Sequence, residues 1–556
     1  MKWKKLEHNG ILFPPDFETK KIKIKIKGES VDLDINQEEM IYQWAKKKDT
    51  PYAQDKVFQK NFVADFAKTF GKKYKKLELD DVDFKNAFNL VDKEKDAKEL
   101  LTKEEKKALA AKRKELREEM KVKFGTGKMD GNEVEIANYM AEPPGIFIGR
   151  GEHPLRGKWK PKVTSKDVTL NLGKEAKVPV GNWGKIVHDQ ESMWMASWTD
   201  YLTQKRKYVW LADTAGIKQD RDKAKYDKAK MLAKEIETIK NKIVKDMQNK
   251  DPKVRRISTV CWLIYRTAMR VGDEKDPDEA DTVGATTLRK EHVTLTSDAI
   301  KFDFLGKDSV RWQETVPAVG NDKQFHENLK ELTAKIKATD EIFGNLTSRD
   351  VNEYYKTVVK GLTAKVFRTF SASTVVSKYL NENGDVKKGS QMEKLYHAKL
   401  ANLEAAIMCN HKRTIPKTFE QSLQKKRDTL KTAEKATPWK KNEEVLKKAE
   451  STKTKTDAQE KKRKERITKI KGMIKKSKAK QKERVEKLRL QLDLTEKTRD
   501  YNLGTSLRNY IDPRIFKSWT DEVTADWEKL YTAALQKKFL WVKSENESWQ
   551  NVSKHY

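Results

Sequence analysis

The sequence predicts a mostly helical α+β protein with several domains. Long charged stretches such as residues 101–124 have many oppositely charged neighbours four residues apart, as solvated helices do. Shorter stretches, such as residues 299–316, alternate apolar and polar residues around a turn and predict strands. The chain has 556 residues, enough for several domains of about 150 residues each.

The N-terminal part of the chain combines a hairpin, helices and short strands. Residues 1–20 are expected to form a tail that includes Pro14 and Pro15. Next, KIKIKIKGESVDLDI alternates with period two around a glycine and predicts a short hairpin with a basic face. Residues 36–121 have a mostly helical pattern, whereas the glycines and prolines of EPPGIFIGRGEHPLRGKWKP exclude a long helix. Strands are then expected at VTLNL and YVWLA.

The C-terminal part is more helical. Residues 217–413 read as a helical domain interrupted by the hairpin AIKFDFLGKDSVRWQETV, whose turn is GKDS. Within residues 461–490 there are 15 Lys or Arg and 3 Glu, yet apolar residues recur at helical spacing. We therefore expect an antiparallel two-helix coiled coil with its turn near residues 451–457, the alternative being a disordered basic tail. Residues 498–556 should form a compact end.

Composition points to a polyanionic partner. Lys and Arg number 119 against 85 Asp and Glu, a net charge of +34, which also suits a ribosomal or chromatin component. The 14 Trp, 19 Phe and 16 Tyr are too many for a wholly disordered chain. Cys261 and Cys409 give no disulfide framework and suit a reducing compartment. We see no secretion signal and no apolar run that could span a membrane.

Several kinds of phosphate and metal chemistry lack their motifs. GTGKMDG has the wrong spacing for a P-loop, and neither H-E-x-x-H nor a cysteine pair occurs. The acidic stretch LELDDVDF is better explained as a solvated helix face than as a metal site. Phosphate chemistry in this chain would therefore proceed without ATP and without a catalytic metal.

Guanidinium groups can take the place of a metal, since they are planar, always charged and bidentate. Arg270 closes an apolar helix, where it could also be a helix-terminal cation, and Arg368 lies between two Phe, where its head could also reach water. Lys307 lies in the hairpin turn and His411 ends a helix, positions that are commonly just exposed or structural. In SLRNYIDPRI, Tyr510 is either a half-buried aromatic or a nucleophile. Each signal is weak alone.

Taken together, these residues and their surroundings resemble eukaryotic-type DNA topoisomerase I, the type IB family. The matching strings are TAMRVGDEKDPDEADTVG, FDFLGKDSVRW, GLTAKVFRTFSAS, IMCNHKR, PKTFE and GTSLRNYIDPRI, and the resemblance runs from KWKKLEHNG at the start to the C-terminal segment. The resemblance implies a bilobed DNA clamp with mixed α/β core subdomains, a coiled-coil linker and a small helical C-terminal domain. The implied domains are an N-terminal core, a catalytic core, the linker and the C-terminal domain, at residues 1–213, 214–414, 415–497 and 498–556.

The resemblance also implies a role for each catalytic candidate. Tyr510 matches the nucleophile that forms a 3′-phosphotyrosyl link and frees a 5′-hydroxyl. Arg270 and Arg368 match the pair that binds the non-bridging oxygens, and His411 matches a histidine that donates a hydrogen bond to one of them. Lys307 matches the lysine that reaches a base in the minor groove and protonates the leaving oxygen.

Further positions match the family's DNA-binding residues. Arg150, Asp308 and Asn509 match positions that line the cleavage gap, where camptothecin-type poisons bind in the family, and Thr505 matches a residue near the scissile phosphate. EHP at 152–154 and DEAD at 278–281 resemble the two lips of the clamp. One departure is Ile148, which replaces an arginine of the family's FRGRG and puts one DNA or lip contact in doubt.

The implied activity is the relaxation of positive and negative supercoils by transient single-strand cleavage, strand rotation and religation. It would need no ATP, cofactor or metal. We expect a monomer that binds double-stranded DNA in a strongly salt-dependent way, and no membrane association. We expect a nuclear protein if the chain comes from a eukaryotic cell. Because the family's long N-terminal region is missing, the alternatives are a viral protein of the virion or a cytoplasmic replication site, and a truncated chain. A tyrosine recombinase and a non-enzymatic architectural DNA-binding protein are the alternatives.

Overall fold

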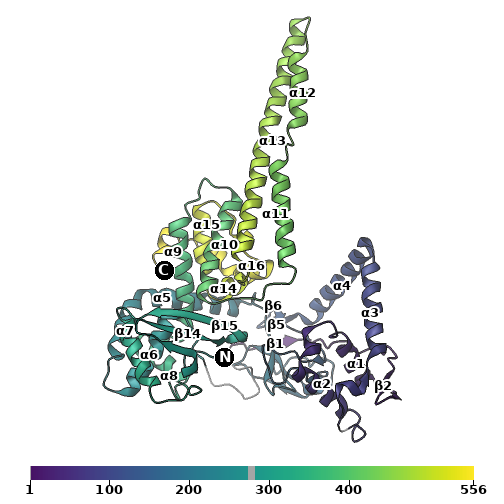
Figure 1. The fold of residues 1–556 in the computed structure, drawn as a ribbon, viewed down its shortest axis with the longest axis vertical. Helices are drawn as coiled ribbons and strands as arrows, with labels where there is room; N and C mark the ends of the chain where they lie inside the picture. Colours follow the sequence, from purple (N-terminus) through teal and green to yellow (C-terminus); the bar gives the residue numbers. More distant parts are fainter. Residues whose placement is uncertain (1, 75, 273–281) are drawn as a thin grey trace. The chain divides into compact units, whose positions relative to one another are not determined.

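The computed structural model describes residues 2–74, 76–272 and 282–556, which fold into two compact units (Figure 1). Unit 1 comprises Met1–Asp222, Glu274–Val283 and Leu305–Ser309, and unit 2 comprises the rest of the chain. Helices predominate and several sheets accompany them, so the predicted mostly helical α+β class is confirmed. The predicted lip at 278–281 lies outside the described residues.

One core of unit 1 is built on a seven-stranded sheet in the order β1-β5-β6-β12-β11-β9-β10. Its strands are β1 (Leu6–His8), β5 (Thr126–Met129), β6 (Asn132–Ala137), β9 (Thr169–Asn171), β10 (Lys185–Val187), β11 (Trp194–Thr199) and β12 (Arg206–Leu211). Only β9 and β10 pair in parallel; the other neighbours are antiparallel. The strands predicted at VTLNL and YVWLA are thus confirmed.

The prediction of an N-terminal tail is wrong. Strand β1 pairs with β5 at the edge of this sheet, and Trp3 and Leu6 are buried in its core. A strand of three residues is too short for its alternation to be recognised in the sequence, whereas its tertiary partner holds it in place.

The second core of unit 1 surrounds the predicted basic hairpin, which is confirmed as β2 (Ile24–Ile26) and β3 (Glu29–Val31). Helices α1 (Ile35–Ala45) and α2 (Lys56–Lys68) pack on it, with Trp44 stacked on Phe62. Ile148 packs against the same cluster, so the residue that departs from the family pattern serves this core.

Two further predictions for unit 1 have different outcomes. Helix α4 (Lys103–Phe124) follows α3 (Lys85–Leu100) and has no buried residue, which confirms a solvated helix. LELDDVDF, in contrast, is not a helix face: it forms a 3₁₀ turn at Leu79–Asp81 and then strand β4 (Val82–Asp83), because β4 completes the β3-β2-β4 sheet. The Gly- and Pro-rich segment contains only the short strands β7 (Gly145–Ile146) and β8 (Trp159–Lys160).

Helix α5 (Gly216–Asp246) leads into unit 2. The predicted hairpin, whose turn groups with unit 1 and whose strands lie mostly in unit 2, is confirmed in the β13-β14-β15 sheet, formed by Val293–Leu295, Ala299–Gly306 and Val310–Pro317. Around it lie α6 (Pro252–Thr267), α7 (Asp322–Thr333), α8 (Ser348–Val358), α9 (Ala364–Asn383) and α10 (Gln391–Met408). Among the described helices, none is both long and apolar enough to cross a membrane.

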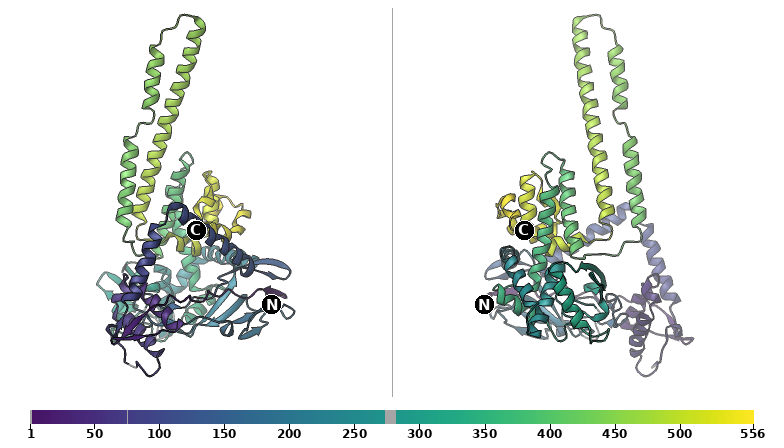
Figure 2. Two further views of the ribbon diagram at one scale, coloured as in Figure 1. Left: turned by 90° about the vertical axis from the view of Figure 1, so that its right-hand side faces the viewer. Right: turned by 60° about the vertical axis from the view of Figure 1, so that its left-hand side comes forward.

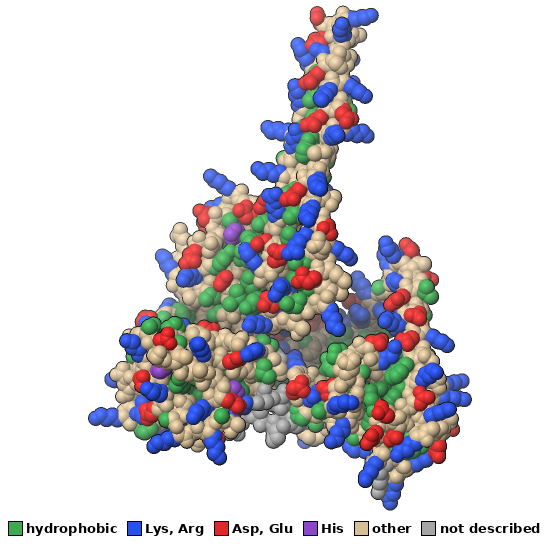
Figure 3. Space-filling view, in the orientation of Figure 1, with side chains coloured by type: hydrophobic (Ala, Val, Ile, Leu, Met, Phe, Trp, Pro, Cys, Tyr) green, Lys and Arg blue, Asp and Glu red, His purple; other side chains and the backbone are tan. Residues whose placement is uncertain are grey.

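The predicted coiled coil is confirmed within unit 2 (Figures 1 and 2). One arm is α11 (Phe419–Lys435) followed by α12 (Lys440–Ser451), and the other is the single helix α13 (Asp457–Lys497). The turn falls between Ser451 and Asp457, as predicted, and Ile470 and Ile474 are buried against Ala449. The break in the first arm was not predicted; it coincides with Pro438, which cannot continue a helix. Lys and Arg side chains project along both arms (Figure 3).

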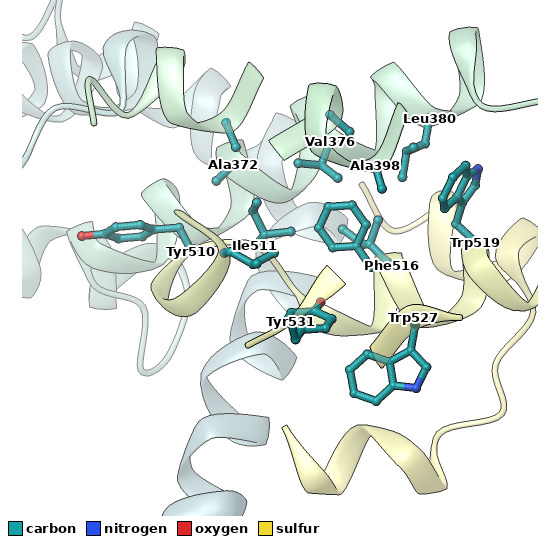
Figure 4. Packing of buried hydrophobic residues seen from close by; sticks show 14 of the residues in the cluster. Ala372, Val376, Leu380, Ala398, Tyr510, Ile511, Phe516, Trp519, Trp527 and Tyr531 are labelled. Atoms are coloured by element: carbon teal, nitrogen blue, oxygen red, sulfur yellow. The ribbon is translucent and has the colours of Figure 1, made fainter. Parts of the chain in front are cut away.

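The compact C-terminal end forms its own hydrophobic cluster with α9 and α10 (Figure 4). Its helices are α14 (Leu503–Asn509), α15 (Pro513–Glu522), α16 (Ala533–Lys538) and α17 (Trp549–Ser553). Phe516 and Trp519 of α15 are buried against Val376 and Leu380 of α9. The C-terminal end is therefore fixed to the helix that carries Arg368.

Candidate active site

Tyr510 lies in the corner between α14 and α15, at the rim of the C-terminal cluster. Its backbone N–H still bonds to Ser506 of α14, and the next residue, Ile511, is buried. Asp512 then caps α15 by accepting a hydrogen bond from the Arg514 N–H, and Pro513 occupies the first helical position, where proline is favoured. The sequence IDPR thus ends one helix and starts the next, and Tyr510 is held between them. Figure 4 shows its hydroxyl directed away from Ile511 and Phe516.

Arg270 reaches the Tyr510 hydroxyl: its Nη1 lies 2.9 Å from the phenol oxygen and donates to it. The expectation that Arg270 closes a helix is wrong, because α6 ends at Thr267 and Ala268 adopts φ 50°, ψ 26° in the left-handed region. This reversal turns the chain away from the helix axis. Arg270 therefore belongs to the segment after the helix, which aims its guanidinium at Tyr510.

Two glycines hold the Arg270 segment in place. Gly272 has a φ of 85°, and a Cβ on Gly284 would lie 2.4 Å from the Gly272 Cα atom. The contact lets the backbones join, with Ala285 N–H bonded to Arg270 O at 2.8 Å and Thr286 N–H to Val271 O at 2.7 Å. Only glycine permits so close an approach.

Arg368 lies on α9 with only 8% of its surface exposed. Its Nη1 donates to Ala268 O at 3.0 Å, its Nη2 donates to Cys409 O, and its guanidinium carbon lies 5.0 Å from the Tyr510 ring centre. The reading in which its head reaches water is therefore excluded. Two backbone carbonyls fix the guanidinium beside the phenol, while its Nε is buried without a partner among the described residues.

His411 is placed by the way α10 ends. Asn410 has a φ of 51°, the Asn410 N–H bonds to Ile407 O, and the His411 N–H bonds to Ala406 O, which together form a Schellman cap. The cap turns the imidazole onto Tyr510, where the two rings stack with centres 5.4 Å apart and planes at 28°. The backbone of His411 is also fixed, because its carbonyl accepts the Asn502 N–H at 2.7 Å.

The imidazole of His411 is uncharged and unsatisfied. Burial, followed by the charges of Arg368 and Arg270, lowers its pKa from 6.5 to about 3. Within the described part of the chain, both of its ring nitrogens are buried without a hydrogen-bond partner. A buried polar group of this kind normally has a partner, so the site is arranged to hydrogen-bond a group beyond those of the described residues.

The charge of the site favours an anion. Neither Arg270 nor Arg368 pairs with a carboxylate among the described residues; their partners are a phenol and two carbonyls. Burial, and next the nearby Arg368 charge, lower the pKa of Arg270, so the two cations disfavour each other. A bound phosphodiester would relieve this repulsion and accept hydrogen bonds from both guanidiniums and from the imidazole.

The structure therefore brings together Arg270, Arg368, His411 and Tyr510, all in unit 2. Lys307 is exposed on the turn of the β14–β15 hairpin, in the 3₁₀ turn Lys307–Ser309 that also holds the Asp308 backbone. These turn residues group with unit 1, as does Arg150. Within that unit the Arg150 loop meets the turn, since a Cβ on Gly151 would lie 2.2 Å from the Ser309 Oγ atom.

The two remaining predicted DNA-binding residues lie on α14, one turn apart. Asn509 is exposed and its side-chain amide donates to Thr505 O at 3.1 Å. Thr505 is half-buried. Sequence reasoning missed the carbonyls of Ala268 and Cys409 that hold Arg368, because backbone groups leave no trace in residue types. It also missed Ser373, whose only signal is a serine in the middle of an apolar helix.

Comparison with known protein families covers nearly the whole chain. The model of the eukaryotic DNA topoisomerase I DNA-binding fragment matches residues 1–211, that of the catalytic core matches 214–445, and that of the C-terminal topoisomerase domain matches 482–551. All four residues of the Tyr510 site fall within the latter two matches.

Individual relatives agree. DNA topoisomerase 1 beta of Arabidopsis thaliana is 36% identical over 97% of this chain and 58% of its own length. DNA topoisomerase 1 of Homo sapiens is 33% identical over 97% of the chain and 71% of its own length, and that of Candidozyma auris is 33% identical over 99% and 83%. A buried tyrosine among cationic and imidazole groups thus occurs in a chain that is similar to these DNA topoisomerases. The chain belongs to the eukaryotic DNA topoisomerase I family. It spans 58% of the length of the Arabidopsis relatives.

Proposed function

We propose that this chain is a type IB DNA topoisomerase. It relaxes positive and negative supercoils by cutting one strand, letting that strand rotate and resealing it, without ATP or a required metal. The observation that carries the proposal is the 2.9 Å hydrogen bond from Arg270 Nη1 to the Tyr510 hydroxyl, at a site where a second guanidinium and an unsatisfied imidazole also converge.

In the proposed cleavage step, the Tyr510 oxygen attacks a backbone phosphorus. A bond forms between that oxygen and phosphorus, and the bond from phosphorus to the 5′ oxygen breaks, so the DNA keeps a 3′-phosphotyrosyl end and a 5′-hydroxyl end. A free tyrosine has a pKa of about 10 and is a weak nucleophile at neutral pH. In the transition state, the guanidinium bonded to its oxygen stabilises the negative charge that develops there as the proton leaves to water.

The other groups act on the phosphate and on the leaving oxygen. Arg270 and Arg368 stabilise the charge that develops on the non-bridging oxygens, and His411 donates a hydrogen bond to one of them. A neutral imidazole suits this task because it carries an N–H without adding a third positive charge. Lys307 is proposed to give its proton to the departing 5′ oxygen.

Religation runs the same step backwards. One phosphodiester is exchanged for another, so the energy of the broken bond is kept in the phosphotyrosine and no nucleotide is needed. While the strand is open, its free end turns about the intact strand and torsion in the DNA drives the turning. We propose that the protein acts as a monomer clamped around the duplex, with Arg150, Asp308, Asn509 and Thr505 near the gap.

The decisive experiment compares the full-length protein with the Tyr510→Phe variant on supercoiled plasmid in EDTA without ATP. We expect the unchanged protein to relax both positive and negative supercoils, and Tyr510→Phe to lose relaxation and covalent adduct completely while it keeps DNA binding. The phenyl ring keeps the packing with His411 and removes only the nucleophile.

Mapping the trapped adduct completes the test. Attachment of the 3′ end to Tyr510 supports the proposal. A requirement for magnesium, attachment through a 5′ end, or an active Tyr510→Phe variant would overturn it. Strand exchange between defined sites would instead indicate a recombinase, and DNA binding without any cleavage would indicate an architectural protein.

A further inference from the structure

Ser373 of α9 hydrogen-bonds the backbone of the Tyr510 corner, and Arg368 lies on the same helix. Ser373 lies five residues further along the same helix, about 7.5 Å along its axis. It has no exposed surface. We propose that Ser373 is a positioning residue for Tyr510, an inference that rests on the proposed function.

The Ser373 hydroxyl bridges the peptide groups on both sides of Ile511. It accepts a hydrogen bond from the Asp512 N–H at 3.0 Å and donates toward the Tyr510 carbonyl oxygen at 3.4 Å. A serine hydroxyl has one donor and two acceptor sites, so it can make both bonds at once. It therefore fixes the backbone from which the phenol projects.

The far side of the corner is fixed by a buried ion pair. The carboxylate of Asp512, which has no exposed surface, accepts hydrogen bonds from Arg514 and from the Tyr556 hydroxyl at 2.8 Å. Arg514 is itself paired with Asp227 of α5 at 2.7 Å. Because the ion pair already fixes this side, the Ser373 hydrogen bonds determine the position of the corner relative to α9.

In this arrangement a single helix, α9, positions both the phosphate and the nucleophile. Arg368 holds the phosphate and Ser373 holds the nucleophile, and the helical backbone between them sets their spacing. A misplacement of about 1 Å between reacting groups can cost about 100-fold in rate. We expect that Ser373→Ala lowers the rate constant of DNA cleavage by about 10- to 100-fold.

The test is single-turnover cleavage of an oligonucleotide duplex by the full-length protein, with Ser377→Ala as the matched control. Ser377 lies one helical turn further on α9 and is equally buried. Within the described part of the chain its hydroxyl makes a single hydrogen bond, to Ser553 O at 3.5 Å. Both changes remove a buried hydroxyl from the same helix. A purely structural role would lower the reactive fraction and the melting temperature in both variants alike.

A positioning role has a different signature. Ser373→Ala should lower the rate constant of the fraction that reacts, leave the DNA Kd unchanged, and slow religation by the same factor, so that the covalent fraction at equilibrium is kept. Ser373→Cys, which keeps a weaker donor and acceptor, should fall between Ser373→Ala and the unchanged protein. The reacting fraction is read from the amplitude, so partial unfolding does not hide the rate constant.

This experiment distinguishes failure of the positioning role from failure of the proposed function. If the unchanged protein cleaves and Ser373→Ala has the rate constant of Ser377→Ala, the positioning role is overturned and the proposed function stands. If the unchanged protein does not cleave, the proposed function itself fails.

Discussion

At the scale of single residues, His411 gives the site a pH dependence whose sign can be worked out. Its pKa falls from 6.5 in the unfolded chain to about 3 in the folded protein. Below pH 6.5 the unfolded chain therefore binds a proton that the folded chain does not. Each pH unit between these values costs the folded state up to about 1.4 kcal/mol. We expect His411→Gln to lose less unfolding free energy than the unchanged protein between pH 7 and pH 5.

The measurement is denaturant unfolding of both proteins at the two pH values. NMR titration of the DNA-free protein provides the independent check, and the His411 ring signals should stay flat from pH 8 to pH 5. A His411 midpoint near pH 6.5 would contradict the shift, as would equal acid sensitivity of the two proteins.

At the scale of elements, the pair of glycines beside Arg270 makes a prediction about activity. Gly272→Ala combines a strained φ with a Cβ that would lie 2.9 Å from the Gly284 Cα atom. The strain is of the order of 1–3 kcal/mol. The segment would relieve it by moving, which would draw Arg270 away from the phenol. We expect cleavage to slow at least tenfold, measured as a single-turnover rate constant.

Gly320→Ala is the control for this change. Gly320 also has a positive φ, 55°, but a Cβ there meets nothing within 4 Å. This variant should be slightly less stable and cleave at the normal rate. Similar cleavage rates for both variants would show that the glycine contact does not position Arg270.

Elements with many repeated contacts could be predicted from the sequence, and elements held by one distant partner could not. In the coiled coil, apolar residues recur at helical spacing over several turns. In the β14–β15 hairpin, apolar and polar residues alternate on both sides of the turn. Strand β1 has three residues and is defined only by β5, more than 100 positions away. Likewise, the motifs predict the residue types of the site. The backbone carbonyls that bind Arg368 could not be predicted, because their positions depend on how α6 and α10 end.

At the scale of the whole molecule, we propose that much of the exposed positive charge binds DNA without taking part in the chemistry. The coiled coil is the clearest case, since Lys and Arg outnumber Glu fivefold within residues 461–490. Phosphates of a turning duplex would be attracted to such a surface. Our hypothesis is that this attraction acts as friction and slows strand rotation.

The structure shows where the coiled coil can be shortened. Removing residues 437–478 takes away α12 and the facing part of α13, and keeps the bond from Gln481 Nε2 to Ala433 O at the new end. A short Gly/Ser connection can join the two arms, which are about 10 Å apart. We expect faster rotation per cleavage event in single-molecule relaxation of twisted DNA.

A charge variant of the intact coiled coil is the matched control. Lys461, Lys462 and Arg466 are exposed, and changing them to Gln keeps the length while it removes charge. Friction through phosphates predicts faster rotation here too, with a weaker dependence on salt. An unchanged rotation speed in both variants would reject the hypothesis.

The burial of Tyr510 in the C-terminal cluster has a mechanical consequence. The tyrosine has 6% of its surface exposed, and Leu507 and Ile511 on either side of it belong to the same apolar cluster. In the proposed intermediate, the DNA end is tethered through this side chain while the duplex twists under torque. Force applied to the DNA strand is then distributed over the whole packed cluster. The cluster would have to unfold before such a force could pull Tyr510 out of its position.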